Sequence, residues 1–206
     1  GALLALAATA PNRLEITEAG GIGPLVQMLG CTDGRARERA EGALVRLSIE
    51  NANRVLIIKK LVSMLEDSPF DAVDGAGAQE QAAAALSNLA RDSSDNRTSI
   101  VDAGGVSPLL GLLGPDSTPK AKENAVNAIT QLAYKSATIQ ASISAAGGVP
   151  LIAQIMVSSC ANSKEMMAGA QLCSLTARAV AQLSEGNEQI QSAMAEAGVI
   201  PALVSM

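Results

Sequence analysis

The sequence contains no histidine and no tryptophan, and only one phenylalanine and one tyrosine among its 206 residues. Without histidine the chain lacks the commonest general base, the usual imidazole metal ligand, and any Ser-His or Cys-His nucleophile pair. We therefore predict a protein that is not an enzyme and that uses neither a cofactor nor a metal. Its 48% hydrophobic content is mostly small aliphatic residues, which suit closely packed helices.

The chain also lacks any cluster of basic residues. It carries 15 Lys and Arg against 20 Asp and Glu, a net charge of −5, and no stretch that could follow a phosphate backbone. We therefore expect no nucleic-acid partner. No apolar run reaches the ~18 residues of a membrane span, and residues 1–6 lack the charged leader of a signal peptide. We expect no direct insertion into a membrane.

Cysteine is scarce as well. Cys31, Cys160 and Cys173 are widely spaced and form no metal-binding CxxC motif. An odd number of distant cysteines predicts free thiols in a reducing compartment. We therefore expect a cytoplasmic protein, or a nuclear one.

The chain repeats one helical pattern from end to end. In the best copy, Ala82, Leu86 and Leu89 recur at helical spacing, which predicts an amphipathic helix. Related copies begin 41, 42, 43 and 51 residues apart: GALLALA at Gly1, GALVRLS at Gly42, AALSNLA at Ala84, NAITQLA at Asn127 and RAVAQLS at Arg178.

A glycine corner recurs four times along the chain, three times before a copy and once after the last one: EAGGIGPLVQML, DAGGVSPLLGLL, AAGGVPLIAQI and EAGVIPALV. Glycine ends a helix readily in the left-handed conformation, and Pro108 suits the first turn of the next helix. We predict three helices per repeat and a positive φ at Gly104 or Gly105. In the same repeat we predict that Asn96 caps a first helix over residues 97–103.

Periods of about 40 to 47 residues are typical of armadillo and HEAT arrays. The pattern NxxxI, AGG, PL(V/L)xLL and ALxNLA resembles the armadillo family over almost the whole chain. The segments QEQAAAALSNLA and KENAVNAITQLA are most similar to the arrays of plant-type U-box proteins and vacuolar armadillo proteins. This resemblance implies an all-α fold, a right-handed α-solenoid of three-helix repeats.

We expect a single array over residues 1–206 that is truncated at both ends. Asn53 lies only 8 residues before Leu61, against 13 from Asn96 to Leu109, so the third segment is degenerate or has lost residues. We predict a mobile linker over residues 67–79. We also predict an insertion over residues 156–169, whose methionines either fill the core or form a soft binding surface. The expected segments are a partial repeat 1–11, repeats 12–52, 53–95, 96–137 and 138–186, and a partial repeat 187–206.

The repeated copies that begin at Gly1, Gly42, Ala84, Asn127 and Arg178 form the third helix of each repeat. These third helices are expected to line a concave groove. The resemblance implies that the Asn of ALxNLA holds the backbone of an extended peptide. That position reads Ala5, Arg46, Asn88, Gln131 and Gln182, so the family role carries over to Asn88, and the two glutamines offer the same amide.

Four residues before each of these, importin-type arrays carry a tryptophan that grips lysine stems. Here the residues are Gly1, Gly42, Ala84, Asn127 and Arg178, so the groove is not importin-like. Four residues earlier again, Glu38, Glu80 and Glu123 form either a solvated helix face or an acidic groove edge. The predicted peptide-binding groove is thus of mixed charge and comprises Arg46, Asn88, Gln131, Gln182, Asn127, Arg178, Glu38, Glu80 and Glu123.

These observations predict a non-enzymatic scaffold that binds other proteins through an extended peptide or a helix in its groove. Two alternatives stay open. One is the substrate-recognition arm of a U-box-type ubiquitin ligase, which an upstream U-box would identify. The other is an architectural subunit of a large assembly, which would use its convex faces and insertions instead of the groove.

Overall fold

The computed structural model describes residues 1–31, 33–66, 75–162 and 167–204, and every regular element among them is a helix. The chain divides into two compact units, Gly1–Gly104 and Gly105–Met206, called here the N-terminal and C-terminal units. Each is described by itself.

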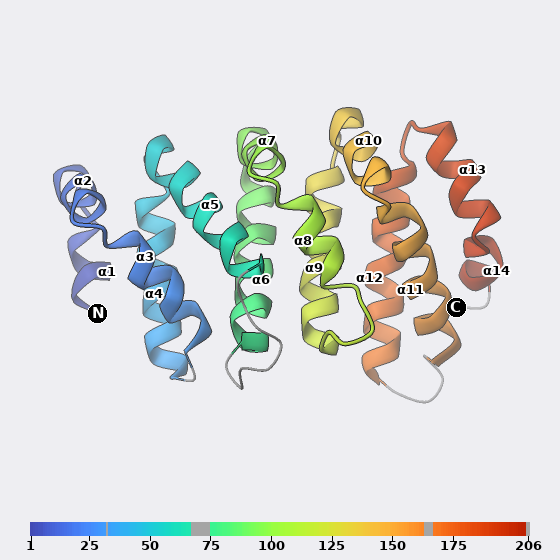
Figure 1. The fold of residues 1–206 in the computed structure, drawn as a ribbon, viewed down its shortest axis with the longest axis horizontal. Helices are drawn as coiled ribbons and strands as arrows, with labels where there is room; N and C mark the ends of the chain where they lie inside the picture. The colour runs from blue at the N-terminus through green and yellow to red at the C-terminus, as the bar shows by residue number, and fades with distance from the viewer. Residues whose placement is uncertain (32, 67–74, 163–166, 205–206) are drawn as a thin grey trace. The chain divides into compact units, whose positions relative to one another are not determined.

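In the N-terminal unit, α1, α4 and α6 stand in one layer, and α2, α3 and α5 lie in front of them (Figure 1). The elements are α1 (Ala2–Leu6), α2 (Ala10–Glu18), α3 (Ile22–Gln27), the 3-10 helix η1 (Met28–Gly30), α4 (Gly34–Leu47), α5 (Asn51–Glu66), α6 (Gly75–Asp92) and α7 (Ser94–Asp102).

Helix α4 shows how nearby residues determine where a third helix begins and which of its faces is buried. Its N-terminus is capped by Asp33, whose carboxylate accepts hydrogen bonds from the backbone N–H groups of Arg35 and Ala36 at 2.9 and 3.3 Å. Its buried residues recur three and four apart and give the helix one apolar face. They are Ala40, Ala43, Leu44 and Leu47.

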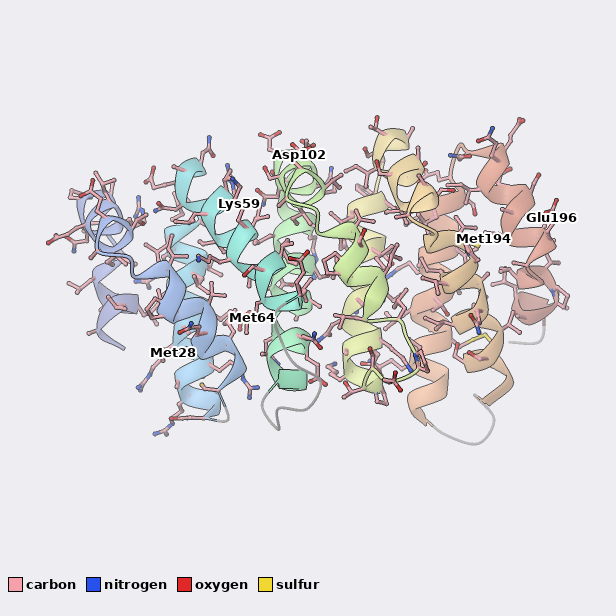
Figure 2. The ribbon with its side chains drawn as sticks, viewed as in Figure 1. Met28, Lys59, Met64, Asp102, Met194 and Glu196 are labelled. Carbon is pink, nitrogen blue, oxygen red and sulfur yellow. A yellow bond between two sulfur atoms is a disulfide. The ribbon has the colours of Figure 1, made fainter. Side chains whose placement is uncertain are left out.

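Helix α5 occupies the segment in which the spacing is short. It runs without a break from Asn51 to Glu66, so the first two helices of this repeat form one continuous helix with no glycine corner. Ile57, Ile58 and Leu61 are buried along it. Lys59 lies on the exposed side of the same helix, and Met64 lies near its C-terminal end (Figure 2).

The predicted linker over residues 67–79 is wrong in its last part. Residues 67–74 lie outside the described residues, but Gly75 already begins α6. The buried Gln79 donates from Nε2 to the backbone oxygen of Leu65 at 2.9 Å. A Cβ on Gly30 would lie only 2.8 Å from the Cβ of Ala78. The start of α6 therefore packs against η1 and is tied to the end of α5.

In the C-terminal unit, α9 and α12 form one layer, with α10 and α11 in front (Figure 1). The expected insertion is largely absorbed by these helices, because α11 extends to Asn162 and α12 begins at Met167. Met156 is fully buried and belongs to the core, whereas Met166 lies outside the described residues. The elements are α8 (Val106–Gly111), α9 (Pro119–Ala133), α10 (Ala137–Ala145), α11 (Gly148–Asn162), α12 (Met167–Ser184), α13 (Glu188–Glu196) and α14 (Val199–Val204).

The C-terminal end of this unit keeps the same division between core and surface. On α13, Met194 is 3% exposed and belongs to the core. Glu196, the last residue of that helix, is exposed, as is Asp102 at the end of α7 in the other unit (Figure 2).

The glycine corners confirm the predicted positive φ at Gly104, where φ is 79°. Gly20, Gly147 and Gly198 repeat this conformation, with φ of 75°, 80° and 79°. At the corner after Gly147, α10 and α11 are bent by 81° relative to each other. Among the described residues, no single helix has the length and apolar character of a membrane span, and only this bent pair reaches them together.

The predicted cap at Asn96 is wrong. Ser93 caps α7, because its hydroxyl accepts the backbone N–H of Asn96 at 3.1 Å. Asn96 lies inside the helix, 2% exposed, and its Nδ2 donates to the backbone oxygen of Leu89 at 2.7 Å. It therefore satisfies a carbonyl in the last turns of the preceding third helix, a group that has no partner within its own helix.

The same arrangement recurs in other repeats. Asn12 donates to the backbone oxygen of Leu6 at 3.0 Å. In the C-terminal unit, Gln140 donates to Ala133 at 3.3 Å and Gln191 to Ser184 at 2.8 Å. The polar residue in the first turn of each of these first helices thus binds the end of the third helix before it.

The expectation of three free thiols is wrong. Cys160 on α11 and Cys173 on α12 form a disulfide, with their Cα atoms 5.1 Å apart. The antiparallel approach of the two helices brings together residues that are 13 positions apart, which spacing along the chain does not reveal. Cys31 is a free, half-buried thiol. The inference of a reducing compartment, which rested on three free thiols, loses that support.

Replacing Gly104 by alanine should destabilise the N-terminal unit by about 1 to 2 kcal/mol, because a side chain disfavours the left-handed conformation. A Cβ at this position would meet no atom within 4 Å, so the cost comes from the backbone alone. Gly77→Ala is the matched control. It also has open space, lies inside α6, and should stabilise by about 1 kcal/mol. Denaturant unfolding of both variants measures the difference, and equal midpoints would contradict the assignment.

Reduction of Cys160–Cys173 should lower the free energy of unfolding by about 3 kcal/mol, the value expected for a loop of this length. The measurement compares denaturant midpoints with and without reductant. Cys31→Ser serves as the control and should show the same shift. Thiol titration of the unreduced, unfolded protein should find one reactive cysteine, and finding three would refute the disulfide.

Candidate functional site

The predicted groove residues of the N-terminal unit are exposed on the third helices. Arg46 on α4 donates from Nη1 to the backbone oxygen of Leu4 on α1 at 2.7 Å. Asn88 on α6 is exposed, and its Oδ1 accepts a hydrogen bond from Nη2 of Arg91 at 3.1 Å. Asn88 therefore keeps its amide N–H groups available at the surface. Ala5, at the same position of α1, is also exposed but offers no polar group.

In the C-terminal unit, the two predicted glutamines lie at the same helical position. Gln131 on α9 is half-buried. Gln182 on α12 donates from Nε2 to Glu185 at 3.4 Å, while its Oε1 is buried and has no hydrogen-bond partner among the described residues. The backbone oxygen of Gln182 accepts from Nε2 of Gln140 at 2.9 Å. Gln182 is thus held by its neighbours, but its own side-chain oxygen is unsatisfied.

Two predicted peptide contacts bind each other instead of facing an empty groove. Nη2 of Arg178 on α12 donates to Oδ1 of Asn127 on α9 at 2.6 Å. Further along the same two helices, Nε2 of Gln171 donates to Oε2 of Glu123 at 3.3 Å. These two bonds link consecutive third helices on one side. Whether Asn127 and Arg178 also touch a ligand stays a prediction.

The three glutamates predicted as a row have different surroundings. Glu38 is exposed and Glu80 is half-buried. Glu123 is 8% exposed. Its Oε2 forms a salt bridge with Nζ of Lys120 at 3.2 Å and also accepts the hydrogen bond from Gln171. A solvated face is therefore wrong for Glu123. It is buried because α12 covers α9 there, a contact between distant segments that helical periodicity does not report.

The structure also shows a small pocket that the sequence analysis missed. It lies between α4 and α6 and measures about 70 Å³. Asn88 belongs to its rim, so the pocket opens beside a predicted groove residue. We call it the α4/α6 pocket. Its lining is Leu29, Glu41, Leu44, Val45, Ser48, Ile57, Leu61, Ala85, Asn88 and Leu89.

A larger hollow of about 480 Å³ lies in the C-terminal unit, among the end of α8, the start of α9, and helices α11 and α12. Leu113, Leu151 and Ile155 contribute apolar walls. Lys122 is the charged residue of its lining, and its ammonium donates to the backbone oxygen of Pro115 at 3.3 Å. None of the predicted groove residues lines this hollow.

Metal-binding side chains do not cluster in the part of the chain that the structure describes. Over residues 1–31, 33–66, 75–162 and 167–204, no three or more His, Cys, Asp or Glu side chains gather as metal ligands would. The polar groups of the site are amides, guanidinium groups and carboxylates on helix surfaces. Such groups can bind main-chain and side-chain groups of a partner.

Comparison with known proteins identifies one repeat by sequence. Residues 93–134 match the family model described as "Armadillo/beta-catenin-like repeat". The chain is 36% identical over 110 residues to Vacuolar protein 8 of Candida albicans (strain SC5314 / ATCC MYA-2876). That alignment covers 51% of this chain and spans 18% of the length of Vacuolar protein 8.

Solved structures show the same architecture over nearly the whole chain. An engineered protein matches with a TM-score of 0.67 at 26% identity, covering 98% of this chain and 78% of the other. A designed armadillo repeat protein in complex with the peptide (KR)4 matches with a TM-score of 0.67 at 22% identity, covering 98% of this chain and 80% of the other.

The bond between Arg178 and Asn127 should couple α9 to α12 energetically. Arg178→Ala and Asn127→Ala each remove it, so the double variant should be less destabilised than the sum of the two, by a few tenths to about 1 kcal/mol. Denaturant unfolding of the four proteins measures this coupling. Arg178→Ala combined with Gln154→Ala is the matched control and should be additive, because Gln154 lies on α11 away from the bond. Full additivity in both pairs would contradict the link.

Proposed function

We propose that this chain, an all-helical armadillo-repeat solenoid, is a non-enzymatic scaffold that binds an extended segment of a partner protein along its third helices. The observation that carries the proposal is that the same position of the third helix carries an amide side chain in each of the two units. Asn88 is exposed with its N–H groups available, and Gln131 is half-buried at the same helical position. A carboxamide can donate to a peptide carbonyl and accept from a peptide N–H at once.

The chemistry of the row supports a peptide over other ligands. An extended segment exposes a backbone donor and acceptor at each residue, and the amide at this helical position offers a matching acceptor and donor within each unit. The designed protein of the same fold holds the peptide (KR)4. Here the same helical position carries Arg46 on α4, and the predicted groove residues include both arginines and glutamates, so charge would select among segments instead of excluding either sign.

The open alternatives keep the same binding role in a different setting. A ubiquitin-ligase arm and an architectural subunit would each use these helices to contact other proteins. No contact or charge in the described residues favours either over a simple scaffold. The groove proposal is therefore the one that the exposed amides support directly.

Replacing both Asn88 and Gln131 by alanine should weaken binding of native partners by roughly 1 to 3 kcal/mol per lost amide. The fold should survive, because neither side chain belongs to the buried core. Affinity capture with the double variant measures partner recovery, and circular dichroism checks folding. The matched control is Gln27→Ala with Gln189→Ala, two exposed positions away from the third helices. If the Asn88 and Gln131 double variant recovered every partner as well as wild type does, the partners would bind through other surfaces.

A further inference from the structure

The α4/α6 pocket exists because the contact between the third helices α4 and α6 is open, whereas the corresponding contact between α9 and α12 is closed. On α9, Val126 and Thr130 are 0% and 3% exposed. The repeat alignment places Glu41 and Val45 of α4 at these two positions. Glu41 is exposed, and Val45 is 61% exposed. The contact between α9 and α12 is therefore sealed, and the contact between α4 and α6 is not.

The partner helices show the same contrast. On α12, Ala179 and Leu183 are fully buried. Their counterparts on α6, Ala85 and Leu89, are only half-buried. The sequence supplies a cause, because a carboxylate such as that of Glu41 is costly to remove from water. With Glu41 at the rim, α6 cannot close against α4 as α12 closes against α9.

What remains exposed is a socket with apolar walls. Its apolar lining comprises Leu44, Val45 and Leu89, together with Ile57 and Leu61 of the continuous helix α5. An apolar cavity of about 150 Å³ can hold benzene, so a pocket of about 70 Å³ suits one branched aliphatic side chain. Glu41 at the rim disfavours an acidic side chain inside the pocket by charge repulsion.

One face of α4 is positive although the whole chain carries a net charge of −5. Arg35, Arg39 and Arg46 are exposed, and their spacing of four and seven residues places them on one face of the helix. Arg46 reaches Leu4 on α1, and the guanidinium of Arg39 lies near Gly1, where an added Cβ would be 3.9 Å from its Nη1. The positive face therefore lies on the α1 side of α4, one helix away from the pocket.

We propose that the α4/α6 pocket takes one aliphatic side chain of an extended partner segment, and that a carboxylate about three residues away in that segment meets the arginine face of α4. The spacing follows because adjacent helices lie about 8 to 10 Å apart and an extended chain advances about 3.3 Å per residue. The inference rests on the proposed function and adds the side chains that the segment must carry. Asn88, on the pocket rim, would hold the main chain beside the anchor.

The test selects binders from a library of random linear peptides with the wild-type protein and with variants. Wild type should enrich an aliphatic residue with Asp or Glu about three positions from it. Replacing that aliphatic residue by alanine in a selected peptide should lower affinity on the order of tenfold to a hundredfold. Ala85→Leu fills the pocket and should abolish the aliphatic preference. Ala141→Leu, an exposed position on α10, is the matched control and should leave it intact.

The charge requirement has its own pair of variants. Arg39→Glu should remove the preference for an acidic residue. Arg37→Glu makes the same change two residues away on the other side of α4, and should preserve that preference. Thermal melts establish that all variants are folded.

The outcomes separate this inference from the proposed function. Peptides that depend on Asn88 and Gln131 but bind Ala85→Leu as well as wild type would overturn the pocket and leave the groove in place. Enrichment of Lys or Arg as the anchor residue would do the same. If wild type enriches no peptide at all, both the groove and the pocket are overturned.

Discussion

Every helix in this solenoid depends on its neighbours, because a single repeat cannot bury its own apolar face. The structure shows a second dependence of the same kind. The last carbonyls of a third helix have no partner within that helix, and the next repeat supplies one through Asn96 at Leu89 or Gln140 at Ala133. At these junctions the contact between repeats is both apolar and a cap, so the polar residue in the first turn of the first helix is structural. The start of α5 differs, because Nδ2 of the buried Asn53 has no hydrogen-bond partner among the described residues.

This dependence explains what could be predicted from the sequence. Features set by a few adjacent residues were predictable, such as the helical periodicity around Leu86 and the left-handed glycine at Gly104. Features set by contacts between distant segments were not. The pairing of Cys160 with Cys173, and the burial of Glu123 beneath α12, depend on which helices meet. Asn96 shows both within one residue, because the prediction placed it correctly near the start of its helix but assigned its side-chain hydrogen bond to that helix instead of to the end of α6.

The candidate site divides in the same way. Helical spacing correctly predicted that Arg46 and Asn88 lie on the exposed face of their helices. It did not predict the bond between Arg178 and Asn127, which requires knowledge of the side chains facing each other across two helices. The α4/α6 pocket was missed for the same reason. Its one signal in the sequence is Glu41, which stands at the repeat position that Val126 occupies on α9. That signal can be interpreted only once Val126 is known to be buried.

The two contacts between third helices show how one repeated design can serve stability in one place and recognition in another. At α9 and α12, buried aliphatic residues and the Arg178–Asn127 bond close the contact between the two helices. At α4 and α6, the pocket has Glu41 at its rim and apolar residues beside the exposed amide of Asn88. Because each junction contributes to stability separately in a solenoid, one junction can stay open while the others maintain the fold. Recognition can therefore be placed at a single junction by a substitution as small as valine to glutamate.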